Sequence, residues 1–367
     1  MAKETTKRKA DHIRISLNQN VQARKTTAGF EDVHFIHKAL PETDKQKIDL
    51  STTVFNHRFT VPLIAGAITG GTPEATKINA TIAEVVEELG LGMGVGSQRA
   101  AIEDKRFAKT FVVARKKAPT AFLIANIGGV QLVNGYHLKE VKKAIQMIEA
   151  DAIAIHLNPL QEAIQPEGQT NFRGVLEKIV EIAEALEKPV IVKETGAGIA
   201  AEEAKKLETA GVKGIDVSGA GGTSFAAVEY HRAKRQGRRF QSRLGDIFWD
   251  WGIPTAISIV EVSQTVSVPV IASGGIRNGV AVAKALALGA SLASLSHPVL
   301  QSAVEGVKEA KNAFSLLIEE LTNVMFLVGV GSVQTLRQAP LVLTGKTAEW
   351  LKMRGFEVES YARRGRN

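Results

Sequence analysis

The sequence predicts an α/β protein: a (β/α)8 TIM barrel with an N-terminal arm and a C-terminal helical extension. Eight short β-rich runs end in glycine or polar residues, recur at intervals of roughly 25 to 40 residues, and are each followed by an amphipathic helical pattern. Several runs are apolar at consecutive positions, as expected for strands that are covered on both faces. A length of 367 residues leaves room for one barrel with additions. An open doubly wound sheet is the structural alternative.

The chain is predicted to divide into three segments. Residues 1–60 form an arm with a short basic start and a hairpin-like region around DLSTTVFNHRF. Residues 61–300 form the barrel, and residues 301–367 supply a long helix followed by a polar tail. The predicted strands begin at Pro62, Leu91, Phe122, Ala152, Val190, Gly214, Val270 and Ala290.

Helix ends and one long loop can be identified between these strands. Residues 72–90 open with Thr-Pro and close at Gly90, and residues 200–211 close at Gly211, which are the usual start and stop signals of helices. Residues 230–253 are predicted to form the one long loop, and long loops in barrels are usually lids or inserts.

The composition excludes several classes of function. With no cysteine, the chain has no disulfide framework, no thiolate metal site and no catalytic thiol. It has neither an apolar leader nor an uninterrupted apolar span of ~18 residues, so we expect a soluble, cytoplasmic protein without a membrane partner. The net charge of +8 suits an anionic small substrate. No nucleic-acid partner is expected, because the basic residues are spread out, and the cluster Arg363–Arg366 is interpreted as a solvated tail.

Polar residues follow the predicted strands, and these strand ends form the active site in essentially every characterised barrel enzyme. They supply Thr69, Ser97, Arg99, Asn126, His156, Asn158, Lys193, Glu194, Ser218 and the turn from Gly274 to Arg277. The sequence therefore predicts a polar active site at this mouth of the barrel.

Two strand ends are typical of phosphate-binding turns: GAGGTS at residues 219–224 and SGGIRNG at residues 273–279. Glycines let backbone amides approach an anion, and a following helix N-terminus favours negative charge. Thr223 and Arg277 can add a hydroxyl and a guanidinium. Glycine pairs also occur in left-handed turns that have no ligand. Two such turns next to each other, at the position where barrels usually bind phosphate, favour the binding of a phosphate group.

Lys193 ends the apolar run VIVKE, where an unpaired ammonium would be costly to bury. One interpretation is a salt bridge with Glu194. The other is a cation directed at an electron-rich cofactor, or a Schiff-base nucleophile. If Lys193, Asn126 and the phosphate-binding turns face one centre, the barrel could hold a phosphorylated flavin. The N1 edge of the flavin ring would then lie beside Lys193.

A set of motifs spread over nearly the whole chain resembles the type 2 isopentenyl-diphosphate isomerases, a family of FMN-dependent barrel enzymes. The motifs are RKADHI from Arg8, AGAITGGT from Ala65, GVGSQRAAIED from Gly94, ANIGGVQ from Ala125, HLNPLQEAIQPEG from His156, VIVKETGAGI from Val190, IDVSGAGGTS from Ile215, WGIPTA from Trp251 and IASGGIRNG from Ile271. Their ordered set is specific, and the HLNPLQE block is the most telling.

The resemblance implies an isomerase of isoprenoid biosynthesis that interconverts isopentenyl diphosphate and dimethylallyl diphosphate by a 1,3-allylic proton shift. It implies reduced FMN as acid/base catalyst, Mg2+ bound to the diphosphate, NADPH as reductant, and a homotetramer or homo-octamer. A hard cation that bridges one carboxylate to phosphate oxygens is chemically reasonable.

The resemblance also implies roles for individual residues. The catalytic residues would be Gln161, Lys193, His156 and Asn158, and Glu162 would bind the metal. Whether Gln161 or the flavin removes the C2 proton stays open. The implied substrate-binding residues are Arg8, Lys9, His12, Ser97, Gln98, Arg99 and Gln161. The implied FMN-binding residues are Ala67, Ile68, Thr69, Ser97, Asn126, Lys193, Ser218, Thr223, Gly274, Gly275, Ile276, Arg277, Leu295 and Ser296.

Two positions depart from the family pattern. Ile68 replaces the usual methionine, a volume-conserving change that we expect to be tolerated. The sequence SLSHP at residues 294–298 replaces small and apolar residues, which leaves the phosphate contacts there open. The predicted loop with Trp249 and Trp251, and the arm with Arg8, are the expected lids.

Two other functions compete with this interpretation. An FMN-dependent 2-hydroxy acid oxidase or dehydrogenase would use a strand-end histidine as base and would be reduced by its own substrate. A non-catalytic binder of anionic ligands or nucleic acid would rely on the positive charge and would show steep salt dependence.

Overall fold

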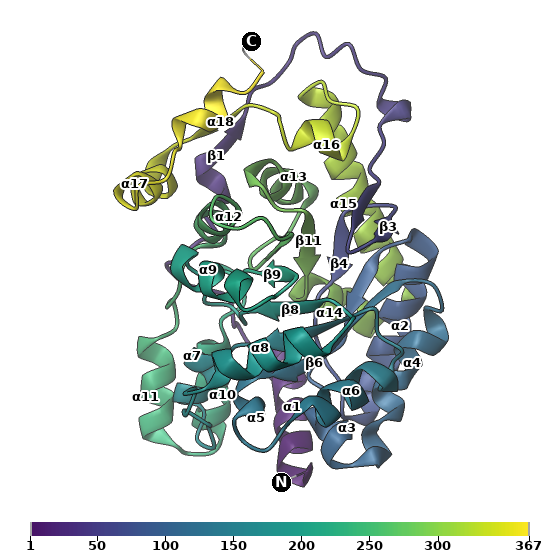
Figure 1. The fold of residues 1–367 in the computed structure, drawn as a ribbon, viewed down its shortest axis with the longest axis vertical. Coiled ribbons are helices and arrows are strands. Elements are labelled where there is room, and N and C mark those ends of the chain that lie inside the picture. Colours follow the sequence, from purple (N-terminus) through teal and green to yellow (C-terminus); the bar gives the residue numbers. More distant parts are fainter. Residues whose placement is uncertain (1, 366–367) are drawn as a thin grey trace.

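The computed structural model describes residues 2–365, and its centre is a closed barrel of eight parallel strands (Figure 1). Around the barrel, each strand pairs with the next in chain order, and β11 closes onto β4. The strands are β4 (Leu63–Ala65), β5 (Gly92–Gly94), β6 (Phe122–Gly128), β7 (Ala152–His156), β8 (Val190–Lys193), β9 (Gly214–Asp216), β10 (Val270–Ser273) and β11 (Leu292–Leu295). All eight predicted strands are confirmed, and the doubly wound alternative is wrong.

Helices cover the outside of the barrel, and their ends follow the sequence signals. The Thr72 hydroxyl accepts a hydrogen bond from the Ala75 amide at 3.2 Å, and Gly90 ends the helix in the left-handed region at φ +64°. The helices after the strands are α2 (Pro73–Leu89), α3 (Arg99–Glu103), α4 (Lys109–Lys117), α5 (Gly129–Leu132), α6 (Leu138–Met147), α7 (Pro159–Ile164), α8 (Val175–Ala185), α9 (Ala201–Thr209), α10 (Phe225–Arg235), α11 (Arg239–Ile247), α12 (Thr255–Ser263) and α13 (Gly279–Leu288). Short 3-10 turns are η1 (Phe30–Asp32), η2 (Lys45–Lys47) and η3 (Lys105–Phe107).

The predicted hairpin closes the N-terminal end of the barrel. Strands β2 (Thr52–Val54) and β3 (His57–Phe59) pair antiparallel. The Phe55 ring stacks on Phe122, the first residue of β6, with ring centroids 5.7 Å apart. Because aromatic side chains fill this end, the opposite end, where the strands finish, is left for a ligand.

The arm begins with helix α1 (Ala2–Asn18), which lies at the bottom of Figure 1 and packs against α3, α10 and α14. These three elements follow barrel strands, so α1 lies across the C-terminal mouth. Further along the arm, β1 (Val33–Phe35) pairs antiparallel with β12 (Leu341–Leu343) near the C-terminus.

The C-terminal extension differs from its prediction. The predicted long helix is present as α15 (Val307–Leu327), but it starts later than expected, because Gly306 at φ +146° separates it from a preceding helix, α14 (His297–Glu305). The polar tail is folded: α16 (Val333–Leu336), β12, α17 (Gly345–Met353) and α18 (Glu359–Arg363) bury Leu351 and Tyr361. Arg364 donates to the Ala287 carbonyl at 2.7 Å, so the basic cluster is not simply solvated; Arg366 lies outside the described residues.

The loop predicted for residues 230–253 is also wrong, because α10 and α11 occupy most of it with a turn at Gly237. The many arginines of this segment interrupt the apolar periodicity by which a helix is recognised in the sequence. Among residues 2–365, no helix is both long and apolar enough to cross a membrane.

Candidate active site

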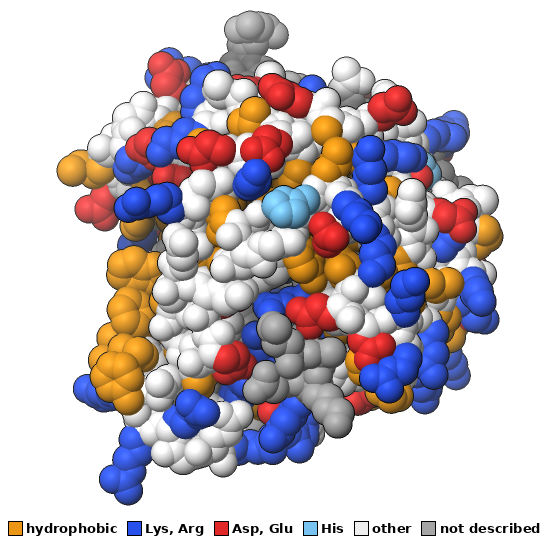
Figure 2. Space-filling model, turned by 60° about the horizontal axis from the view of Figure 1, so that its bottom comes forward, with side chains coloured by type: hydrophobic (Ala, Val, Ile, Leu, Met, Phe, Trp, Pro, Cys, Tyr) orange, Lys and Arg blue, Asp and Glu red, His pale blue; other side chains and the backbone are white. Residues whose placement is uncertain are grey.

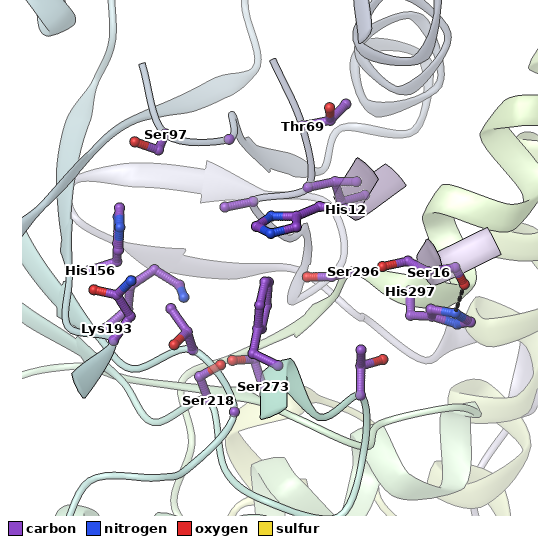
Figure 3. Close-up of a pocket in the computed structure, with 18 of the residues that line it drawn as sticks. His12, Ser16, Thr69, Ser97, His156, Lys193, Ser218, Ser273, Ser296 and His297 are labelled. Atoms are coloured by element: carbon purple, nitrogen blue, oxygen red, sulfur yellow. Dashed lines mark hydrogen bonds between the residues drawn. The ribbon is translucent and has the colours of Figure 1, made fainter. Parts of the chain in front are cut away.

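A cavity of about 250 Å³ lies at the C-terminal mouth of the barrel, beneath α1. Every residue predicted to bind substrate, cofactor or metal lines it, except Gln98. Figure 3 shows the strand-end residues Thr69, Ser97, His156, Lys193 and Ser218 around His12, which comes from the arm. Ser273 was named only as the start of a predicted phosphate-binding turn. The sequence reasoning missed Ile13, Ser16, Gly96, Gln131, Thr195, Gly196, Phe225, Ser294, His297 and Leu300.

One end of the cavity is built to receive an anion. A Cβ atom on Gly222 would lie 2.3 Å from the Gly275 amide nitrogen, so the two glycine turns pack backbone against backbone. Gly274 and Gly275 take φ values of +99° and +68°, which only glycine adopts easily. The Thr223 hydroxyl is buried and has no hydrogen-bond partner within residues 2–365. An orphaned hydroxyl in a glycine cradle fits the phosphate of FMN.

The guanidinium of Arg277 completes this end. Burial lowers its pKa, and its Nη2 donates to the side-chain oxygen of Gln22 at 2.6 Å. At the divergent strand-eight end, His297 lines the cavity and bonds through Nε2 to the Ser16 carbonyl of α1, at 2.9 Å. The dashed line in Figure 3 marks this contact, which ties the arm to the anion end.

Lys193 lines the cavity, and its ammonium donates to the backbone carbonyl of Glu194 rather than to its carboxylate. The Glu194 carboxylate instead accepts backbone N–H bonds from Thr195 at 2.5 Å and Gly196 at 2.6 Å. Burial raises the pKa of Glu194 to about 7, although the hydrogen bonds from these backbone N–H groups act to lower it. The salt-bridge interpretation of Lys193 is therefore wrong, and its charge remains directed toward the cavity.

His156 is held as a neutral imidazole. Its Nδ1 lies 2.8 Å from the Asn126 side-chain oxygen, and the amide nitrogen of that side chain donates to the Val95 carbonyl at 3.0 Å. The amide oxygen can only accept, so Nδ1 carries the proton. Burial, then the positive charges of Lys193 and Lys9, lower the pKa of His156 to about 3.

The side chain of Gln98 does not reach the cavity, unlike those of the other residues predicted to bind substrate. Its side chain is fully buried, donating to the Ala144 carbonyl at 2.9 Å and accepting from the Asn126 backbone N–H at 2.9 Å. Because Gln98 is the N-cap residue of α3, its side chain turns inward while that of the next residue, Arg99, reaches the cavity. Gln98 therefore positions Asn126, and through it His156.

Another part of the cavity wall contains the carboxylate of Glu162 and the amides of Asn158 and Gln161, with Gln165 and Gln169 bonded to Glu162 from behind. Glu162 accepts from the Asn158 side chain at 3.0 Å and from the Gln169 backbone N–H at 2.7 Å. The side-chain oxygens of Asn158 and Gln165 are buried without partners in the described chain. Residues 2–365 contain no group of three or more acidic or histidine side chains arranged to hold a metal. One carboxylate with amide oxygens fits a Mg2+ ion that is completed by phosphate oxygens and water.

The arm adds cations to this side. The Lys9 ammonium donates to the Ser97 carbonyl, and burial, then the charge of Arg8, lowers the pKa of Lys9 to about 7. Arg8 lies 3.9 Å from Glu167, and Arg99 donates to Glu103 at 2.7 Å. Three basic residues on two elements can therefore contact one anionic group.

Sequence reasoning missed Glu229, which joins the arm to the barrel. Its carboxylate is completely buried; Oε1 lies 2.8 Å from His12 Nε2 and 3.5 Å from Gln161 Nε2, and Oε2 accepts from Arg232 at 3.0 Å. The Asn158 side chain donates to the Gln161 oxygen at 3.0 Å, so Gln161 is held from both sides. The only sequence signal was a glutamate and an arginine three residues apart on α10.

The two tryptophans do not line the cavity, which corrects their assignment as a lid. Trp249 is buried, donates to the Gln22 carbonyl at 2.8 Å, and lies under the guanidinium of Arg24. Helix α1, which belongs to the arm predicted as the other lid, covers the mouth.

Comparison with known proteins assigns the family. The chain is 50% identical over 362 residues to the isopentenyl-diphosphate delta-isomerase of Methanosarcina barkeri, covering 99% of this chain and 98% of that one. It is 47% identical to the Methanothermobacter thermautotrophicus enzyme, covering 97% and 99% of the two chains. The chain belongs to the type 2 isopentenyl-diphosphate delta-isomerase family. The isomerase of Pyrococcus furiosus is also 50% identical, covering 95% of this chain and 90% of that one.

Wider relationships place this isomerase family among flavin barrels. Residues 158–343 match the family of FMN-dependent dehydrogenases. A lactate oxidase structure from Pediococcus acidilactici has a TM-score of 0.66 at 20% identity, covering 94% and 93% of the two chains. A mandelate oxidase structure has a TM-score of 0.62 at 19% identity, covering 93% and 99%. At these identities the oxidases share the fold of the isomerase family.

Proposed function

We propose that the protein interconverts isopentenyl diphosphate and dimethylallyl diphosphate by a 1,3-allylic proton shift, in isoprenoid biosynthesis (EC 5.3.3.2). The observation that carries the proposal is one cavity with two anion-binding sides, separated by Lys193, neutral His156 and the clamped amide of Gln161. Two separate anionic groups, the cofactor phosphate and the substrate diphosphate, suit this division. The family assignment supports the same reaction.

Thr223, Gly274, Gly275 and Arg277 would hold the FMN phosphate, with Ser218, Ile276, Leu295 and Ser296 beside them. Ala67, Ile68, Thr69, Ser97 and Asn126 would contact the ring, and the Lys193 ammonium would stabilise negative charge at its N1 edge. When bound in its NADPH-reduced form, FMN supplies an electron-rich acid/base group for protonation of an alkene.

Arg8, Lys9 and Arg99 would bind the diphosphate, and Glu162 would share a Mg2+ ion with it. His12 and Asn158 would line the path between diphosphate and alkene. The pKa of Lys9, near 7 without ligand, would rise when an anion binds beside it, so diphosphate binding and protonation of Lys9 favour each other.

Gln161 would lie against the reacting carbons. Asn158 occupies its oxygen and Glu229 attracts its N–H group, so the amide keeps one orientation. The helix α1 would exclude water from the developing positive charge. His156, neutral in the physiological range, would not repel that charge.

The test is an anaerobic reaction with FMN, Mg2+, NADPH and isopentenyl diphosphate, followed by product analysis. We expect dimethylallyl diphosphate only when the flavin is reduced, with far less than one NADPH consumed per turnover. Bound flavin without isomerisation would overturn the substrate assignment. Flavin reduction by a 2-hydroxy acid would instead favour the oxidase function.

Replacing Thr223 by valine is expected to raise the dissociation constant of FMN by roughly 10- to 100-fold, because a hydrogen bond to a charged phosphate contributes ~1.5 to 3 kcal/mol. Valine keeps the shape of threonine and removes the orphaned hydroxyl. Fluorescence titration of the flavin-free protein measures the change. The matched control is Thr209→Val on the exposed end of α9, and equal affinities of the two variants would contradict the assignment.

A further inference from the structure

A carboxyl group lies buried inside the barrel, deeper than the active-site cavity. On the face that Figure 2 brings forward, acidic side chains lie at the surface among lysines and arginines. Asp216, the last residue of β9, is instead only 7% exposed. It lines an interior cavity of about 20 Å³, which also touches Lys193, Asn126 and Ser294 of the active-site cavity. Acidic side chains are rarely buried unless they are paired, so the position of Asp216 calls for a physical reason.

The strand register places Asp216 beside Lys193. Strands β8 and β9 run parallel and pair Lys193 with Asp216. Both side chains point into the barrel, because both line the small interior cavity. Within residues 2–365 neither of them belongs to an ion pair, and the Lys193 ammonium donates to the Glu194 carbonyl. A lysine and a carboxyl therefore face one interior space without neutralising each other by direct contact.

Hydrogen bonds connect Asp216 to the active-site cavity. Its Oδ1 accepts from the Ser273 hydroxyl and, at 3.3 Å, from the Ser218 backbone N–H. Both serines line the active-site cavity, and Figure 3 shows their side chains next to each other there. A hydroxyl group both donates and accepts hydrogen bonds. The Ser273 hydroxyl can therefore pass a proton between the cavity and the buried carboxyl.

Few other charges act on this carboxyl. Burial raises the pKa of Asp216, and the charge of Lys193 acts to lower it. Among the described residues that line the small cavity, these two are the titratable ones. The neighbour on β10 is Ser273, the Glu194 carboxylate accepts from its own loop, and His156 on β7 is neutral. The protonation of Asp216 should therefore respond mainly to charge that appears beside Lys193.

We propose that Asp216 is a charge-balancing proton site, which takes up a proton through Ser273 when FMN is reduced beside Lys193 and releases it when FMN is oxidised. The inference rests on the proposed function, in which the N1 edge of the flavin lies at Lys193. Reduction by NADPH gives the flavin two electrons and one proton and leaves one negative charge at this edge. That charge raises the pKa of Asp216, so its carboxylate takes a second proton from solvent and becomes a carboxylic acid. The Lys193 charge then stabilises the reduced flavin without competition from Asp216.

The first test is the midpoint potential of FMN in the holoenzyme, measured between about pH 7 and pH 9 in wild type and in Asp216→Asn. The slope of the potential against pH counts the protons that are taken up with two electrons. The second proton appears above the pKa of Asp216 in the oxidised protein, where the carboxylate is present before reduction. We expect the wild-type slope to rise from one proton toward two as the pH increases, and the slope of the variant to stay at one, because an amide takes up no proton.

The matched control is Asp151→Asn. Asp151 precedes β7 at the opposite end of the barrel and accepts from Arg115 at 2.8 Å. This variant should show the wild-type slope. Equal slopes in wild type and Asp216→Asn would overturn the proposal.

A second measurement uses wild type alone, so it does not depend on the folding of a variant. Infrared difference spectra of the holoenzyme, reduced minus oxidised, should show a new C=O stretch of a carboxylic acid at the upper end of this pH range. The band should shift when the protein contains isotope-labelled aspartate, and the absence of such a band would refute the proton site. Neither readout needs isomerisation. A protein that binds no FMN overturns the proposed function together with this inference, whereas a holoenzyme with a one-proton slope and no aspartate band overturns this inference alone.

Discussion

Replacing Gln161 by alanine is expected to lower kcat by roughly 10²- to 10³-fold or more, while the affinity for FMN stays within about twofold. The side chain is buried between Asn158 and Glu229, with its oxygen 3.0 Å from the first and its nitrogen 3.5 Å from the second. It belongs to α7 and not to either of the glycine turns that would hold the FMN phosphate. Catalysis and cofactor binding should therefore separate at this residue.

The measurement combines product formation with reduced FMN and a titration of FMN into the cofactor-free variant. The matched control is Gln146→Ala on the exposed side of α6, which should behave as wild type. Loss of FMN binding in the Gln161 variant would move this residue out of its assigned role. If the Gln161 variant kept its turnover, Gln161 would not be needed for the reaction, and other groups of the cavity would carry it.

Replacing Glu229 by glutamine is expected to destabilise the protein and to remove part of its acid sensitivity. The His12 hydrogen bond and the charges of His12 and Arg232 outweigh burial and lower the pKa of Glu229 to about 2, from a usual 4.5. A lowered pKa stabilises the folded state fully above pH 4.5, and this contribution is lost as the pH falls toward 2. For a completely buried group, the shift corresponds to roughly 3 kcal/mol.

Urea unfolding of wild type and variant at several pH values between 7 and 3 measures the effect. We expect a difference in unfolding free energy near neutral pH that narrows in acid, because protonation removes the same charge from wild type. Glu305→Gln, at an exposed position of α14, is the control and should leave the pH profile unchanged. A difference that does not depend on pH would show that the carboxylate charge is not responsible.

The same variant probes the link between arm and barrel. Glu229 contacts His12 on α1 and Gln161 on α7, so its loss should also lower kcat more than it lowers FMN affinity. Because Arg232 also pairs with Glu167, the guanidinium would keep one partner.

The predicted and observed site differ where neighbours in sequence point in different directions. Gln98 and Arg99 belong to the same motif, yet Gln98 bonds Asn126 and Ala144 while Arg99 lines the cavity. Trp249 and Trp251 were expected to cover the mouth, but one is buried against the arm and the other is exposed beside α11. In both cases the direction of a side chain is set by packing that no local pattern records.

The sequence by itself determined the eight strands, the hairpin at the closed end, the glycine cradle and most cavity residues. These depend on short-range patterns: consecutive apolar positions, helix stop signals and glycines at positive φ. Only the tertiary structure decided that residues 230–253 are helical, that the tail is folded, and that Glu229 holds Gln161. Each of these depends on contacts between distant segments, such as Tyr361 with the Leu288 carbonyl or Glu229 with His12. Such tertiary contacts outweigh the local secondary-structure propensity of the residues involved.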